Sequence, residues 1–288
     1  MIIPVSFTEN THNMARARSA TAAPAVHARG APMPGPMLAR GAPMPGPVLA
    51  HHLHRAQLAQ NLSQLLETLT NAAEGYQGAD LIGMGHSGQV AEEVADFQRL
   101  LRSRPTWSKI CECGFNAGHS AALWLHETSA HLISFDYGTL PYSHGSRDLL
   151  SALYPHRTTF HLGDSVVTMA RFAQRVSQGL EAPCDLWFLD GTHTNYFIKH
   201  DLTNALASLQ PDGWIIGDDC SRRFAWVGRQ FRHLAGISRV VNFSQRLVNL
   251  RGALGLRGWC IGRNNASWVG SNVTLLLNAP WETARYRA

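Results

Sequence analysis

The chain is 288 residues long, enough for one large α/β domain with an appendage. Its net charge of +5 lies mostly at the start: residues 1–66 hold five arginines and one glutamate, a net of +4, so residues 67–288 carry only about +1. We therefore expect no nucleic-acid partner, and no apolar run is long enough to span a bilayer.

Residues 1–50 contain an eleven-residue repeat, RGAPMPGPMLA followed by RGAPMPGPVLA. Proline and glycine at this density prevent helices and central strands, so we predict a disordered Pro/Gly/Ala/Arg-rich tail. The tail is nearly free of acid, which is loosely typical of an organelle-transit segment. We expect a cytoplasmic protein, with an organelle as the alternative if the tail directs transit. A plain extension or a mispredicted gene start fits equally well.

Residues 51–105 are predicted to form N-terminal helices that cover one side of a ligand site. Leucines with helical spacing predict a helix over residues 53–73. Its apolar stripe fits packing on its own domain or a homo-oligomer contact. A second helix is predicted over residues 89–102, with one apolar face formed by Val90, Val94, Phe97 and Leu101.

A strand, a glycine turn and a helix start are predicted within residues 109–125, KICECGFNAGHSAALWL. Such a corner presents backbone N–H groups and a helix dipole to an anionic group. The spacing Glu112-x-Gly114-x-x-x-Gly118 differs from the G-x-G-x-x-G of dinucleotide sites. It resembles motif I of the class I S-adenosylmethionine-dependent methyltransferases.

Strands and helices alternate through residues 106–288, which predicts a Rossmann-like α/β fold. Its sheet is expected to be doubly wound, mostly parallel and seven-stranded. The first five strands are predicted at residues 109–113, 131–135, 158–162, 185–189 and 214–216. Helices are predicted between and after them at residues 121–127, 146–153, 166–178, 195–209 and 224–234. Two further strands are predicted around residues 246–250 or 259–262 and around residues 274–277.

Aspartates follow four of these strands, at the edge where open α/β sheets bind ligands. Asp136 lies about twenty residues past the glycine turn, where an acid can hold both ribose hydroxyls. Asp164 could meet an adenine amino group. Each aspartate alone also fits an Asx turn, but acids at successive strand ends indicate a site.

Residues 185–220, DLWFLDGTHTNYFIKHDLTNALASLQPDGWIIGDDC, resemble the metal-dependent macrocin O-methyltransferase-like family. The shared features are Asp190-Gly191-Thr192-His193, a following tyrosine, an L-x-P-x-G turn and the pair Asp218-Asp219. Asp212 replaces the first glycine that is usual in that turn. The resemblance covers residues 88–219 and implies that residues 106–288 form a methyltransferase domain.

The resemblance implies a role for each matched residue. Asp190, Asp218 and Asp219 would bind Mg²⁺, and His193 would be the general base, with Asp190 and His193 as the catalytic pair. Glu112, Gly114 and Gly118 would shape the site for the methionine end of S-adenosylmethionine. Asp136 would hold its ribose and Asp164 its adenine. Asp201, on a predicted helix, is expected to be structural or a solvated charge.

The chemistry supports this set. A hard, oxygen-liganded Mg²⁺ binds a hydroxyl, lowers its pKa and orients it toward the methyl group. A histidine nearby suits proton removal, and methyl transfer itself needs mainly positioning. We therefore expect Mg²⁺-dependent O-methylation of a hydroxylated small molecule, such as a glycoside or a catechol-like metabolite.

Three alternatives remain. An N-methyltransferase is disfavoured because its P-P-Y-type motif is replaced here by the loop that starts at Asp190. A catalytically silent cofactor-fold binding protein and a nicotinamide-dependent dehydrogenase both fit the fold class. The five cysteines lack zinc-site spacing, and we expect buried, reduced thiols.

Overall fold

The computed structural model describes residues 57–75, 90–221, 225–236, 238–249 and 256–267. The predicted tail, its repeat and the strand predicted around residues 274–277 lie outside these residues. No helix among the described residues is both long enough and apolar enough to cross a bilayer.

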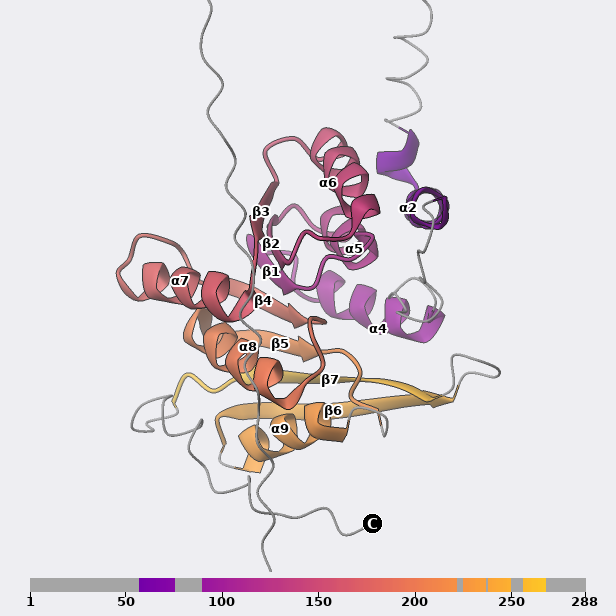
Figure 1. Cartoon of the computed structure of the whole chain (residues 1–288). Coiled ribbons are helices and arrows are strands. Elements are labelled where there is room, and N and C mark those ends of the chain that lie inside the picture. Colours follow the sequence, from indigo (N-terminus) through magenta and orange to yellow (C-terminus); the bar gives the residue numbers. More distant parts are fainter. Residues whose placement is uncertain (1–56, 76–89, 222–224, 237, 250–255, 268–288) are drawn as a thin grey trace, which may run out of the picture. The chain divides into compact units, whose positions relative to one another are not determined.

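One seven-stranded sheet organises the described residues, in the order β3-β2-β1-β4-β5-β7-β6 (Figure 1). The first five strands are parallel, and β7 pairs antiparallel with both β5 and β6. The predicted fold class is therefore confirmed. The strands are β1 (Lys109–Cys113), β2 (His131–Asp136), β3 (Thr158–Leu162), β4 (Cys184–Leu189), β5 (Leu209–Gly217), β6 (Val240–Asn249) and β7 (Leu256–Asn264).

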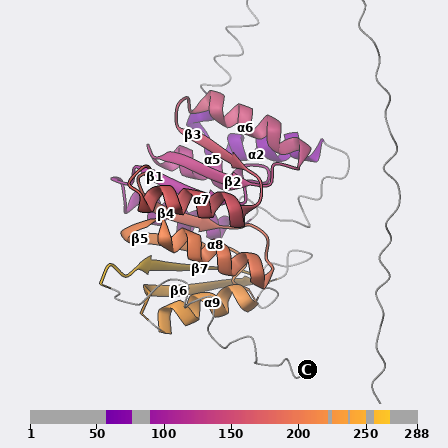
Figure 2. The same ribbon diagram turned by 60° about the vertical axis from the view of Figure 1, so that its left-hand side comes forward.

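Helices cover both faces of the sheet (Figures 1 and 2). One face carries α2 (Leu62–Glu74), α4 (Ala91–Arg102), α5 (His119–Glu127) and α6 (Pro141–Leu153). The other carries α7 (Ser165–Ser177), α8 (Asn195–Ala207) and α9 (Ala225–Gly236). Each face has its own apolar core, with Trp124 and Phe188 in one cluster and Phe135 and Trp187 in the other.

The first N-terminal helix is interrupted at Asn61, and its predicted start at residue 53 lies outside the described residues. Asn61 ends a first helical turn and caps α2, because its side chain accepts a hydrogen bond from the Gln64 N–H at 3.1 Å. The prediction of one continuous helix through this position is wrong. Helix α4 docks on the sheet through Phe97, whose ring lies 5.4 Å from Trp124 and 5.7 Å from Phe188.

The parallel pairing of β1, β4 and β5 aligns the ends that carry the predicted site. Leu189 pairs with Gly217, so the residues after β4 and β5 lie side by side. The Asp190 N–H donates to the Cys113 carbonyl at 2.8 Å, and the Asp218 N–H donates to the Leu189 carbonyl at 2.9 Å. The strand ends are therefore held in one place by backbone hydrogen bonds.

Two disulfides correct the prediction of five reduced thiols. Cys111 on β1 bonds to Cys184 on β4, and Cys220 after β5 bonds to Cys260 on β7. Only Cys113, which is buried, stays free. The partners are 73 and 40 residues apart in the sequence and meet only through the strand order.

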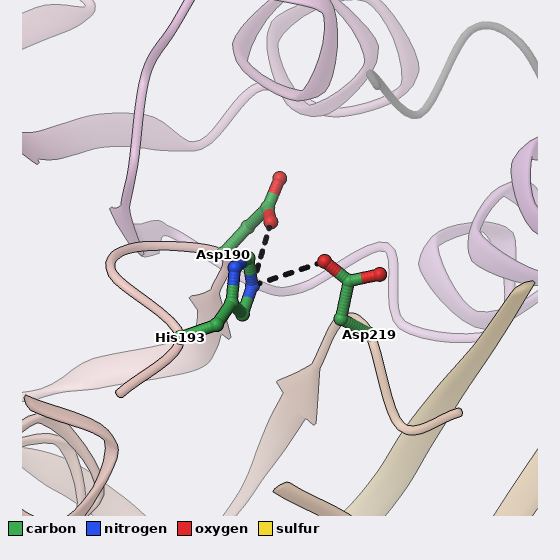
Figure 3. A group of neighbouring side chains, drawn as sticks. All are labelled: Asp190, His193 and Asp219. Carbon is green, nitrogen blue, oxygen red and sulfur yellow. Dashed lines mark ion pairs between the residues drawn. The ribbon is translucent and has the colours of Figure 1, made fainter. Parts of the chain in front are cut away.

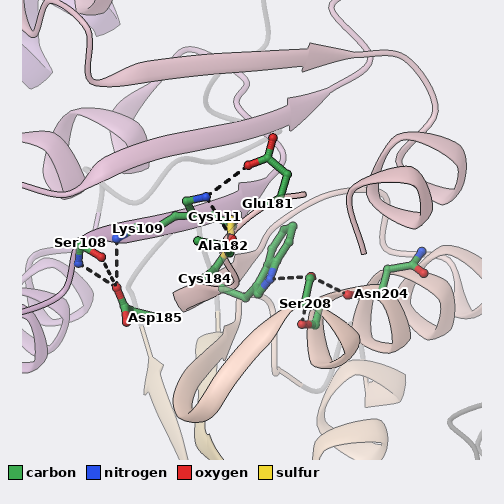
Figure 4. Close-up of a disulfide and its surroundings, with 11 residues drawn as sticks. Ser108, Lys109, Cys111, Glu181, Ala182, Cys184, Asp185, Asn204 and Ser208 are labelled. Atoms are coloured by element: carbon green, nitrogen blue, oxygen red, sulfur yellow. Dashed lines mark hydrogen bonds and ion pairs between the residues drawn. A yellow bond between two sulfur atoms is a disulfide. The ribbon is translucent and has the colours of Figure 1, made fainter. Parts of the chain in front are cut away.

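The first disulfide joins the middle of β1 to the start of β4 (Figure 4). There the Asp185 carboxylate accepts hydrogen bonds from the N–H groups of Ser108 at 2.7 Å and Lys109 at 3.0 Å. The covalent link and the carboxylate therefore fasten the two strands at the edge opposite the aspartates that follow them.

The disulfides predict a thiol count. Protein denatured without reductant should show one titratable thiol per chain, Cys113, and five after reduction. A colorimetric thiol assay measures both values, and a Cys113→Ser variant should show none before reduction. Five thiols in the unreduced sample would contradict the pairing.

Candidate active site

The turn after β1 requires glycine at two positions. Gly114 has φ +94° and Gly118 has φ +86°, in the left-handed region that favours glycine. A Cβ on Gly114 would collide with the Asp190 backbone carbonyl, and one on Gly118 would lie 2.8 Å from the Phe115 ring. The turn therefore packs directly against the loop that carries Asp190.

Glu112 lies in the interior and does not reach the open edge of the sheet. Its carboxylate is fully buried and accepts hydrogen bonds from Ser120 Oγ at 2.9 Å, Trp124 Nε1 at 3.1 Å and Ser134 Oγ at 2.8 Å. Burial raises the pKa of Glu112 to about 7, although these hydrogen bonds lower it. Glu112 thus ties α5 and β2 to β1 beneath the glycine turn.

Asp136 and Asp164 lie at neighbouring strand ends, as predicted from their spacing. Asp136 Oδ2 accepts the N–H groups of Phe115 at 2.9 Å and Asn116 at 3.3 Å, and Oδ1 accepts that of Gly138 at 2.7 Å. Asp164 is exposed and caps α7 through the Val166 N–H, at 2.8 Å. Carboxylate oxygens accept more than one hydrogen bond each, so both groups retain capacity for a ligand.

Asp190, His193 and Asp219 form a close group at the ends of β4 and β5 (Figure 3). His193 Nε2 lies 3.5 Å from Asp190 Oδ1 and 3.1 Å from Asp219 Oδ2. One possible ligand atom from each residue lies within 4.8 Å of the other two. The carboxylates and the imidazole predicted to act together therefore meet around one point.

Asp218 lies beside this group but outside it. The three residues that meet most closely include His193 and not Asp218, so the predicted set of three carboxylates is only partly assembled in this form. Asp218 and His193 both line a small pocket that reaches Asp201 on α8 and Phe231 on α9.

Negative charge dominates the electrostatics here. Burial, with the nearby carboxylates of Asp190 and Asp219, raises the pKa of Asp218 well above its usual value. Burial lowers the pKa of His193, but the Asp190 hydrogen bond and the charges of Asp190, Asp219 and Asp218 outweigh it and raise that pKa to about 9. The imidazole is therefore cationic at neutral pH, and it lies where the carboxylates require positive charge.

Two further charged groups belong to this region and were not predicted. Arg257 on β7 places Nη1 3.4 Å from Asp219 Oδ1. Glu93 on α4 is buried, and burial together with Asp218, Asp190 and Asp219 raises its pKa well above the usual value. The sequence signal for Glu93 was a carboxylate within the apolar face of a predicted helix, three residues after Val90 and four before Phe97.

Asp201 is buried, so its interpretation as a solvated charge is wrong. Its Oδ2 lies 3.7 Å from Cys113 Sγ, and burial raises its pKa to about 6. A Cβ on Gly191 would lie 3.5 Å from the same oxygen. Asp201 therefore packs beneath the loop that carries Asp190.

Replacing Glu112 tests its structural role. Glu112→Ala leaves three buried donors without their acceptor, so the free energy of unfolding should fall by about 3 kcal/mol. Urea denaturation measures the change. Glu67→Ala on the exposed face of α2 is the control and should change stability by less than about 0.5 kcal/mol. Equal stability of the two variants would contradict a structural role of the Glu112 carboxylate.

The raised pKa of His193 predicts a pH-dependent stability of the metal-free protein. The folded pKa of about 9 exceeds the ordinary 6.5, so the stabilisation is present below pH 6.5 and is lost as the pH rises through 9. In EDTA the free energy of unfolding should fall by roughly 3 kcal/mol over this range, since one pKa unit is about 1.4 kcal/mol.

Denaturant unfolding at several pH values measures this slope. His193→Asn should flatten it, whereas His156→Asn, at an exposed loop position with φ +63°, should leave it unchanged. If stability still fell with pH in His193→Asn, the pH dependence could not be assigned to His193.

Comparison with known proteins agrees with this geometry. Residues 111–220 match the family model described as a methyltransferase domain. A sequence comparison with curated proteins gave no significant match.

Two solved structures share the fold. The O-methyltransferase TomG from Streptomyces achromogenes, involved in tomaymycin synthesis and solved with S-adenosylmethionine, is 20% identical, with a TM-score of 0.54 over 69% of this chain and 90% of TomG. The O-methyltransferase from Bacillus cereus, solved with S-adenosylhomocysteine, is 14% identical, with a TM-score of 0.55 over 76% of this chain and 97% of that one. Residues 111–220 are therefore similar to a methyltransferase domain, and the described residues share the fold of these two O-methyltransferases.

Proposed function

We propose that this protein transfers the methyl group of S-adenosylmethionine to a hydroxyl of a small molecule, with a bound Mg²⁺. The observation that carries the proposal is the meeting of Asp190, His193 and Asp219 directly beside the Gly114 turn. A ligand at the turn and an ion between the carboxylates would be neighbours, as transfer between a cofactor and a metal-bound hydroxyl requires.

The donor set fits a hard cation. Asp190, Asp218 and Asp219 offer carboxylate oxygens, which Mg²⁺ prefers, and the free thiol of Cys113 is not in the close group. These three aspartates would hold the ion. When bound, Mg²⁺ polarises the acceptor hydroxyl and lowers its pKa. Its charge also opposes that of the carboxylates, which would lower the pKa of His193 and free the imidazole to accept the hydroxyl proton.

The cofactor would lie along the ends of β1, β2 and β3. Gly114 and Gly118 would leave room for the methionine end, and Glu112 would support that turn from within. Asp136 would accept the ribose hydroxyls and Asp164 the adenine amino group. The acceptor class proposed from the sequence resemblance is a hydroxylated metabolite of glycoside or catechol type.

Cofactor binding tests the proposal. Calorimetric titration of the full chain with S-adenosylhomocysteine in Mg²⁺ should give saturable one-site binding. Asp136→Ala should weaken it at least tenfold, because each lost charged hydrogen bond costs about 1.5–3 kcal/mol. Asp212→Ala, at an exposed position on β5 away from the strand ends, is the control and should bind normally.

A second variant distinguishes binding of the cofactor from binding of the metal ion. Asp190→Asn should retain S-adenosylhomocysteine binding and lose Mg²⁺ binding. A folded wild-type protein that binds no S-adenosylhomocysteine would contradict the proposed cofactor site. One that binds it but shows no affinity for Mg²⁺ would contradict only the metal.

A further inference from the structure

Glu93 is a buried carboxylate whose surroundings among the described residues leave it unsatisfied. It is 3% exposed, and its Oε1 has no hydrogen-bond partner in that part of the chain. Burying a carboxylate without partners is costly, so such a group usually has a ligand or a functional role. Glu93 also interrupts an otherwise apolar helix face, where an aliphatic side chain would pack at lower cost.

The packing of α4 directs Glu93 toward the ends of β4 and β5. Phe97 lies one helical turn after Glu93, on the same face, and packs 5.7 Å from Phe188 of β4 and 6.1 Å from Trp259 of β7. Phe188 lies near the end of β4, and Asp190 follows it by two residues, directly after the strand. The chain turns back between the end of α4 and β1, so the first turn of α4 lies near the strand ends (Figure 1).

The charges around Glu93 agree with this placement. Asp218, Asp190 and Asp219 are the acidic groups that act on it, and Arg257 is the basic one. With Glu93, the region holds four carboxylates against two cationic side chains, Arg257 and His193. Negative charge therefore predominates around Glu93, which favours a cation at this point.

We propose that Glu93 is a fourth carboxylate of the divalent-cation site, so that helix α4 helps to hold the ion together with the strand ends. This inference rests on the proposed metal-dependent function. It assigns to the N-terminal helices a part in the chemistry beyond covering the sheet, because the ion would link α4 to β4 and β5. Metal binding would then stabilise the docking of α4.

Cation affinity of the full chain tests this. Calorimetric titration with Mn²⁺, and then with Mg²⁺, should show that Glu93→Gln lowers the affinity at least tenfold relative to wild type. Glu92→Gln, the exposed neighbour on the same helix, is the matched control and should bind within twofold of wild type. Asp190→Asn should remove detectable binding.

The outcomes separate the inference from the function on which it rests. Normal affinity in Glu93→Gln, with lost affinity in Asp190→Asn, would overturn the role of Glu93 and leave the metal site standing. No Mn²⁺ binding by a wild-type protein that binds S-adenosylhomocysteine would instead overturn the metal-dependent function.

A second measurement keeps the test valid if Glu93→Gln folds poorly. In the wild-type protein, Mn²⁺ should slow amide hydrogen exchange in residues 91–102 at least tenfold, because the ion would hold α4 against the sheet. Asp190→Asn should lose this protection. Equal exchange of α4 with and without Mn²⁺, at concentrations that saturate the wild-type site, would overturn the inference.

Discussion

Repulsion among partly and fully buried carboxylates at the ends of β4 and β5 is the constraint on which the site depends. Parallel pairing places Asp190 and the pair Asp218-Asp219 on adjacent strands, and α4 adds Glu93 from the covering layer. In an interior of low polarity such charges cannot all persist without compensation. His193 and Arg257 supply part of the compensating positive charge. The negative charge that remains uncompensated suits a divalent cation.

A second set of buried interactions holds the glycine turn after β1, where the cofactor is proposed to bind. Glu112 gathers donors from α5 and β2, while Asp136 holds the glycine turn from the end of β2 through two backbone N–H groups. Gly114 allows that turn to touch the backbone of Asp190. The glycine turn and the loop that carries Asp190 are therefore in direct backbone contact, so a movement of one would displace the other.

Local patterns were enough to predict most of the sheet, and the family resemblance supplied the candidate residues of the site. The bounds of β1 and β3 agree with prediction because each is a short extended run that ends at a glycine. The proximity of Asp190, His193 and Asp219 followed from their positions after neighbouring parallel strands. Asp164 caps helix α7, which agrees with the Asx turn that was the alternative for an aspartate at a strand end.

What the sequence did not predict depends on contacts between distant segments. Glu93 lies near the carboxylates only because Phe97 docks α4 on β4 and β7, which follow it by about 90 and 160 residues in the chain. The disulfides likewise join cysteines that the strand order brings together. Strand β5 starts at Leu209, earlier than predicted, because Leu209 already pairs with Cys184. The register then shifts before Trp214, so Pro211 lies in an irregular part of the strand, where proline is tolerated.

The most direct test of the account is a crystal structure with S-adenosylhomocysteine and Mn²⁺, in which anomalous scattering locates the metal. We expect one Mn²⁺ peak among Asp190, Asp218, Asp219 and Glu93, with the sulfur of the cofactor next to it above the Gly114 turn. A cofactor bound at the turn with no metal peak among these carboxylates, or with the peak elsewhere, would contradict the account.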